Sequence, residues 1–160
     1  MPEINIRGKC YNYSKLESSD NGTTLYLESI RLLESTLSDM PPLRDNNDCI
    51  LYSIQDSERV LAAASLYLKP PYRAGRAGNR CLLSRMGVAE ESRRHGLGSA
   101  IFQLVTQEAR ELGFEELDLM ALSPAVPFYE RLVERGLLLK RIPWHRKDLG
   151  YYIVLSNDIT

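Results

Sequence analysis

The sequence has 160 residues, of which 44% are hydrophobic and 26% charged, and its net charge is −1. Such a composition is typical of one globular domain, which we expect to span residues 1–160 with a single core. A net charge near zero argues against a general nucleic-acid or membrane-surface binder, since such proteins usually carry a large basic excess.

The cysteines and the apolar runs also exclude several classes of protein. Cys10, Cys49 and Cys81 have neither CxxC nor Cys/His spacing, so we expect buried or free thiols and no metal site. Residues 1–19 contain no apolar signal region, and no stretch approaches the roughly 18 apolar residues of a membrane span. We therefore expect a cytoplasmic protein, with a homodimer as an open alternative.

Charge is unevenly distributed along the chain. Residues 1–58 contain ten acidic and five basic side chains, whereas residues 69–95 contain seven Lys or Arg and only two acids, Glu90 and Glu91. The basic excess therefore surrounds one short segment of the sequence.

In chain order, residues 4–13 predict a first strand, and the polar run after it predicts a loop. Residues 23–40 predict an amphipathic helix, because Tyr26, Ile30, Leu33, Leu37 and Met40 recur at helical spacing. Two prolines, Pro41 and Pro42, are expected to end it.

A hairpin and a buried strand should follow. Residues 49–55 and 59–68 are rich in strand formers and are separated by a short polar turn, which predicts an antiparallel hairpin. Residues 80–88 predict a buried strand interrupted by Gly87. A glycine there indicates a bulge or close approach of a ligand, or has a plain packing role.

The remaining elements alternate. A helix is predicted over 96–112, with Leu97, Ala100, Ile101, Leu104, Val105 and Leu112 on one face and Gly113 at its C-terminal cap. A strand over 116–122 leads to a helix that Ser123 would cap, with Pro124 first and an end near residue 135. Strands over 137–142 and 151–156 complete an α/β domain with a mixed sheet of about six to seven strands flanked by helices.

The segment from Val88 to Ala100 joins the buried strand to the start of a helix. Its sequence is Val-Ala-Glu-Glu-Ser-Arg-Arg-His-Gly-Leu-Gly-Ser-Ala. Free N–H groups and the helix macrodipole favour an anion at such a helix start, and glycines allow a phosphate to approach the backbone. The basic residues Arg93, Arg94 and His95 add charge, so the segment suits a pyrophosphate; the alternative is a glycine-containing turn with solvated arginines.

Two other phosphate-binding loops are excluded by spacing. A Walker loop requires Gly-Lys-Ser/Thr, which is absent, and a dinucleotide fingerprint requires a small residue where this sequence has Ile101.

The segment Arg93-Arg94-His95-Gly96-Leu97-Gly98 resembles the signature of the GNAT superfamily of acyl-CoA-dependent N-acetyltransferases, and Ala121 to Leu132 resembles that family's strand followed by a helix containing a tyrosine. The resemblance implies a GNAT-like fold that binds acetyl-CoA as co-substrate. It places the pyrophosphate at Arg93–Ser99, and pantetheine along Met86, Gly87 and Val88. Phe128 and Ser123 are further implied contacts, although capping alone explains a serine at 123.

By the same resemblance, Tyr129 is the general acid that protonates the coenzyme A thiolate after a primary amine attacks the acyl carbonyl. The alternative is a tyrosine that packs in the core beside Phe128. A general base is not assigned, because residues 81–86 lack the carboxylate that some relatives have on this strand. The candidates are Asp118, Glu28, Glu34 and His145, each of which also suits a surface role.

Two functions remain open at this point. The first is an N-acetyltransferase whose acceptor, a small molecule or a peptide or protein amine, is a cation attracted by Glu28, Glu34 and Asp39. The second is a non-catalytic acyl-CoA-binding or regulatory module that has lost the base. The helix after Tyr129 is also almost a turn longer than is common in relatives, which weakens analogy to any particular acceptor.

Overall fold

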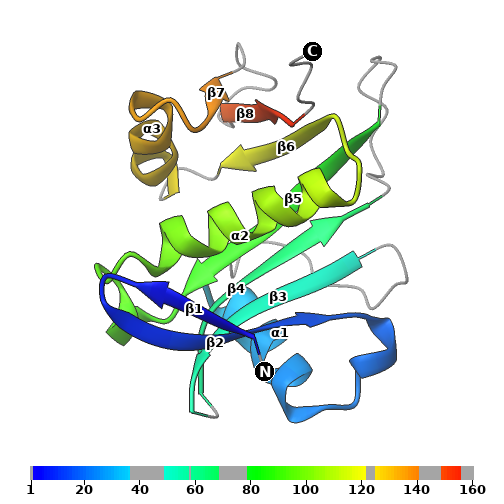
Figure 1. Cartoon of the computed structure of the whole chain (residues 1–160), viewed down its shortest axis with the longest axis vertical. Helices are drawn as coiled ribbons and strands as arrows, with labels where there is room; N and C mark the ends of the chain where they lie inside the picture. The colour runs from blue at the N-terminus through cyan, green and yellow to red at the C-terminus, as the bar shows by residue number, and fades with distance from the viewer. Residues whose placement is uncertain are drawn as a thin grey trace.

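We describe a computed structural model of the chain, covering residues 2–36, 49–57, 59–68, 79–121, 125–140 and 149–155. Eight strands in this part of the chain form one sheet, in the order β1-β2-β3-β4-β5-β6-β8-β7 (Figure 1). The elements are β1 Glu3–Ile6, β2 Lys9–Leu16, α1 Thr24–Thr36, β3 Cys49–Asp56, β4 Arg59–Tyr67, β5 Arg80–Val88, α2 Leu97–Glu111, β6 Glu116–Ala121, α3 Val126–Glu134, β7 Leu139–Lys140 and β8 Leu149–Val154. Neighbouring strands are antiparallel except β5 and β6.

The predicted α/β fold with a mixed sheet flanked by helices is confirmed, and the eighth strand has a local cause. The single strand expected over 4–13 is a hairpin, in which Ile6 pairs with Lys9 across a two-residue turn. Both turn residues have positive φ, 52° at Arg7 and 88° at Gly8. Positive φ at both positions is typical of the tight turns that suit hairpins, and Gly8 provides it at little cost.

The helices lie on both faces of the sheet. Leu97, Ile101 and Val105 of α2 share one buried cluster with Tyr129 and Leu132 of α3. A second cluster contains Tyr26 and Leu33 of α1 with Leu51, Val60 and Ala63 of the sheet. Figure 1 shows α2 crossing in front of the sheet and α1 behind it. The strands between them are consequently almost wholly buried, which explains the continuous apolar runs of β3 and β4.

Most element boundaries follow the sequence patterns. β5 occupies the predicted residues, and β3 and β4 form the predicted hairpin. The predicted inward residues of α1 that the structure describes are buried or half-buried, whereas Leu37 and Met40 lie outside the described residues. Gly113 follows α2 with φ 90°, as a helix-ending glycine should.

Two details of the helix predictions are wrong. Leu112 was placed on the apolar face of α2 but is 42% exposed, because the last buried turn of the helix ends at Ala109. α3 begins at Val126 with Ala125 at its N-cap, later than the predicted start at Pro124. Pro127 occupies its first turn, where a missing N–H costs least. Ser123 lies outside the described residues.

Candidate functional site

Strands β5 and β6 pair only over their first four residues. Their register runs from Arg80↔Glu116 to Leu83↔Leu119, although β5 continues to Val88 and β6 to Ala121. Figure 1 shows the two strands starting side by side and ending apart. Beyond Leu83, β5 keeps its pairing with β4 but has no strand partner on its other side in the described residues. Backbone N–H and C=O groups require partners, so this edge suits an extended ligand that carries amides.

A β-bulge lies where the strands begin to separate. Arg85 pairs with Ser65 and Leu83 with Leu66, so Ser84 is the extra residue. The Ser84 and Ser65 hydroxyls are 2.6 Å apart, which fixes the bulge. Bulges bend a strand and increase its twist, and this one turns the end of β5 away from β6. The irregularity expected at Gly87 therefore lies three residues earlier, and Gly87 itself pairs regularly with Ala63.

The loop after β5 leads into an uncapped helix start. Arg94 has φ 70° and Gly96 has φ 83°, and the chain then enters α2 at Leu97. Gly96 is the N-cap and has no side chain to cap the helix, and none of the described residues gives α2 a capping side-chain hydrogen bond. These N–H groups, together with the positive end of the helix dipole, are suited to bind an anion.

The basic residues of the loop lie around that helix start. The Arg93 guanidinium donates a hydrogen bond to the Val88 carbonyl at 3.3 Å, which joins the loop to the open end of β5. Arg94 and His95 are exposed. The structure therefore brings the predicted pantetheine strand and the predicted pyrophosphate loop together.

Arg7 joins this group although nothing in its sequence neighbourhood indicated it. Its guanidinium donates a hydrogen bond to the Arg94 carbonyl at 3.1 Å, and its Nε lies 3.0 Å from where a Cβ on Gly96 would stand. A cavity of about 460 Å³ beside it is lined by Gly96 and Ser99, and also by Arg135 at the end of α3. The contact spans 87 positions of sequence and depends on the β1–β2 hairpin.

Gly98 lies in a tightly packed position. A Cβ on this residue would stand 3.0 Å from Cε2 of Phe128 and 3.7 Å from Cγ2 of Val88. The end of β5, the start of α2 and the start of α3 therefore meet at this glycine, and Phe128, which was expected to contact the cofactor, lies beside the loop.

Tyr129 lies next to this junction and is 6% exposed. Its ring packs edge-on against Phe128 at 5.1 Å and lies 5.6 Å from the ring of Tyr151. Burial is the main factor that raises the pKa of Tyr129 far above its ordinary value, with a smaller contribution from Tyr151. The hydroxyl is thus held protonated at neutral pH, which is the state that a proton donor requires.

A second tyrosine extends this cluster. The Tyr151 hydroxyl donates a hydrogen bond to the Glu130 carboxylate at 3.0 Å. Burial, followed by that hydrogen bond, raises the pKa of Tyr151 to about 12. Sequence reasoning missed both residues, because Tyr151 belongs to β8 and reaches Tyr129 only through the tertiary fold.

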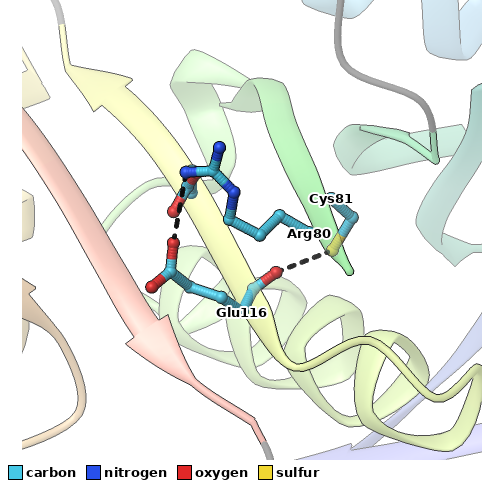
Figure 2. Close-up of polar contacts among 4 residues, drawn as sticks. Arg80, Cys81 and Glu116 are labelled. Atoms are coloured by element: carbon cyan, nitrogen blue, oxygen red, sulfur yellow. Dashed lines mark hydrogen bonds and ion pairs between the residues drawn. The ribbon is translucent and has the colours of Figure 1, made fainter. Parts of the chain in front are cut away.

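The candidates for a general base lie in different environments. Asp118 accepts a hydrogen bond from Arg80 at 3.3 Å, at the end of the strand pair where β5 and β6 remain joined. Figure 2 shows Arg80 and Cys81 beside Glu116 at that end, and the Arg80–Glu116 separation is 3.7 Å. Glu28 is half-buried and Glu34 exposed on α1, whereas His145 and Asp39 lie outside the described residues. Asp118 is therefore engaged in an ion pair.

Within the described ranges, no three metal-ligating side chains lie close enough to hold an ion. No helix in that part of the chain has the length and apolarity needed to cross a membrane.

Three solved structures illustrate which known proteins have the same fold. Tetrahymena GCN5 is 12% identical with a TM-score of 0.70, covering 92% of this chain and 98% of that chain. The GNAT domain of S. lividans PAT is 13% identical with a TM-score of 0.71, covering 96% of each chain. An acyl-CoA N-acyltransferase from Pseudomonas aeruginosa is 16% identical with a TM-score of 0.65, covering 89% of this chain and 98% of that chain. These likenesses establish the fold.

Sequence comparison establishes the family. A search of curated proteins finds no significant match. The model of the acetyltransferase (GNAT) family, however, matches residues 13–133, which include the strand pair, the basic loop and Tyr129. The chain therefore belongs to the acetyltransferase (GNAT) family of acyl-CoA-dependent acyltransferases.

Proposed function

We propose that residues 1–160 form a single domain that transfers an acetyl group from acetyl-CoA to a primary amine of an acceptor. The observation that carries this proposal is the parting of β5 from β6 beside the uncapped start of α2. An open strand edge next to an anion-binding helix start matches a ligand with an amide-containing arm and a pyrophosphate.

In this proposal the pyrophosphate binds the free N–H groups at Gly96–Ser99. Arg93, Arg94 and His95 add positive charge there, and Arg7 adds more from the hairpin. The pantetheine arm pairs with the backbone of Met86–Val88, which orients the acyl carbonyl. Phe128 supports this arrangement by packing against Gly98. Ser123 remains a candidate contact on the basis of sequence alone.

The proposed chemistry is direct attack. The neutral amine nitrogen forms a bond to the thioester carbonyl carbon, the C–S bond breaks, and the electron pair leaves with the coenzyme A sulfur. Tyr129 gives its proton to that thiolate, and the proton lost by the amine passes to a base or an ordered water. Burial raises the pKa of Tyr129, which keeps its hydroxyl protonated but also makes it a weaker acid, so its role as donor rests on its place beside the open end of β5 and on the family resemblance.

A thiol-release assay with acetyl-CoA over a library of primary amines tests the proposal. We expect coenzyme A release above buffer hydrolysis with at least one amine, together with an acetylated product of the matching mass. Coenzyme A should be quantified by chromatography, because the exposed thiol of Cys10 would react with a colorimetric reagent. Binding of acetyl-CoA without turnover over the whole library would contradict catalysis.

The alternative is a non-catalytic acyl-CoA-binding or regulatory module. One observation favours it: β5 carries no carboxylate, and Asp118 on the neighbouring strand is paired with Arg80. The same assay separates the two functions, because a binding module would give acetyl-CoA affinity and no acetylated product.

A further inference from the structure

Two arginines of β5 have opposite environments. Arg80 lies 3.3 Å from Asp118 and 3.7 Å from Glu116, so two carboxylates compensate its charge. Arg85 is only 6% exposed, and among the described residues no side chain or carbonyl accepts a hydrogen bond from it. One strand therefore carries a neutralised arginine at its closed end and an uncompensated one at its open end.

Arg85 lies on the α1 side of the sheet. It pairs with Ser65, and Gly87 two residues later pairs with Ala63, which belongs to the cluster under α1. Met86 and Val88 instead pack against the cluster under α2 and α3. The basic loop and Tyr129 are on that other side, so the phosphates of a bound coenzyme A do not account for Arg85.

The buried polar groups on this side provide no negative charge. Ser65 is bonded to Ser84, Gln55 donates to Ser53, and Ser29 donates to the Leu25 carbonyl. These groups are neutral and already have partners. The half-buried Glu28 and the exposed Glu34 of α1 form no ion pair with Arg85.

A buried guanidinium without a partner is unfavourable, because it stays protonated and loses its hydration. In the described residues, the Tyr52 hydroxyl is the only fully enclosed polar side-chain atom without a partner. No Arg85 nitrogen is in that condition, so each keeps some contact with solvent although the residue is only 6% exposed. The planar fork of an arginine matches a carboxylate, with two parallel hydrogen bonds.

We propose that Arg85 binds a carboxylate of the acyl acceptor, so that the acceptor is a primary amine that carries a carboxylate. This rests on the proposed function, in which the acyl carbonyl lies at Met86–Val88, immediately after Arg85. An acceptor of this kind has both charges, so its ammonium group also remains compatible with attraction by the acidic residues of α1.

Matched acceptor pairs test this specificity. Amino acids and short peptides are assayed with acetyl-CoA, each beside the amide that differs only by loss of the carboxylate charge. We expect the wild type to prefer the carboxylate form of its best acceptor by about 10- to 100-fold in kcat/KM. Arg85→Gln should bring that ratio close to one through a higher KM for the acid, and Arg85→Lys should retain part of it. The Kd for acetyl-CoA should not change.

The result that overturns the proposal is a ratio that Arg85→Gln leaves unchanged, or a best acceptor without a carboxylate whose rate is independent of residue 85. If no amine in either series is acetylated, the proposed function fails, and the occupant of Arg85 is then tested without turnover.

That second test compares stability. If Arg85 lacks an anion in the free protein, Arg85→Met should raise the melting temperature by about 2 to 4 °C, since the uncompensated charge is removed. Arg80→Met is the matched control and should lower it, because it removes the positive charge beside the buried Asp118 and the half-buried Glu116. A fall for both variants would show that Arg85 has a partner within the chain and would overturn the proposal.

Discussion

The two ends of the β5–β6 pair differ in how their polar groups find partners. At the closed end the strands hydrogen-bond to each other, and Arg80 is paired with Asp118 and with Glu116; Figure 2 shows Arg80 beside Glu116. At the open end, past the bulge at Ser84, β5 has no strand partner on this edge in the described residues, where only the Arg93 side chain bonds to the Val88 carbonyl, and Arg85 has no ion-pair partner there.

Polar groups at one end of the strand pair stabilise the fold, whereas those at the other end are available to a ligand. The closed end satisfies its polar groups internally, which favours a fixed structure. The open end leaves donors, acceptors and charge unsatisfied beside a positively charged helix start, and functional sites commonly sacrifice stability in this way. A change at the closed end should therefore affect folding, and a change at the open end should affect binding and turnover.

The largest effect is expected at the closed end. Asp118→Asn should lower the free energy of unfolding in urea by about 3 kcal/mol, because it removes one partner of a buried ion pair while Glu116 stays 3.7 Å from Arg80. Asp56→Asn is the control, because its pair with Lys9 is largely exposed and its loss should have no measurable effect. Equal effects of the two variants on the free energy of unfolding would contradict the view that the buried Asp118 pair stabilises the fold more than the exposed Asp56 pair.

At the open end, Tyr129→Phe should lower kcat by about 100-fold while leaving the Kd for acetyl-CoA unchanged. Its physical reason is the loss of the proton donor for the coenzyme A thiolate. Tyr151→Phe is the control. It removes a neighbouring hydroxyl that is bonded to Glu130 and that has no role in the proposed proton transfer. The assignment fails if Tyr129→Phe turns over at the wild-type rate across the pH range.

The Gly96 backbone should control cofactor affinity. Gly96→Ala should weaken acetyl-CoA binding by about 10-fold, because a side chain at φ 83° is strained and its Cβ would stand 3.0 Å from Nε of Arg7. Gly113→Ala is the matched control: it has φ 90° and no atom within 4 Å of the added Cβ. Affinity for acetyl-CoA is measured by calorimetry. Equal losses of affinity in the two variants would contradict a local role of Gly96, because Gly113 lies at the opposite end of α2.

The pH dependence should reflect the amine more than Tyr129. Burial raises the pKa of Tyr129 above its ordinary value, so the hydroxyl remains protonated throughout the working range. We expect kcat/KM to rise with pH as the acceptor amine loses its proton, with no descending limb up to about pH 9.5. A descending limb below that pH in the wild type, absent from Tyr129→Phe, would show that the tyrosine titrates earlier.

The smallest effect concerns access to the closed end. Burial raises the pKa of the Cys81 thiol to about 12, and Cys10 is exposed. A thiol reagent at pH 8 should therefore label Cys10 rapidly in the folded protein and Cys81 only after unfolding in urea. Rapid labelling of Cys81, measured by peptide mass, would mean that the closed end opens.

Much of the fold could be predicted from local patterns. The β3–β4 hairpin, the extent of β5 and the glycine that ends α2 were each predicted by residues within a few positions. The β1–β2 turn was missed, since Arg7 adopts positive φ without being a glycine or an asparagine. The bulge was misplaced, because it depends on how Ser65 and Ser84 meet across two strands.

Local sequence patterns were enough to indicate the family and the glycine-containing loop that we propose binds phosphate, because spacing between neighbouring residues specifies a strand, a glycine turn and a helix start. Which groups compensate each other depends on the tertiary fold. The contacts of Arg7 with the loop, of Tyr151 with Tyr129, and of Asp118 with Arg80 all join residues far apart in sequence. The local pattern shows that Arg80 and Arg85 lie on a buried strand. Whether the charge of each arginine has a partner depends on where β5 and β6 stay paired and where they separate.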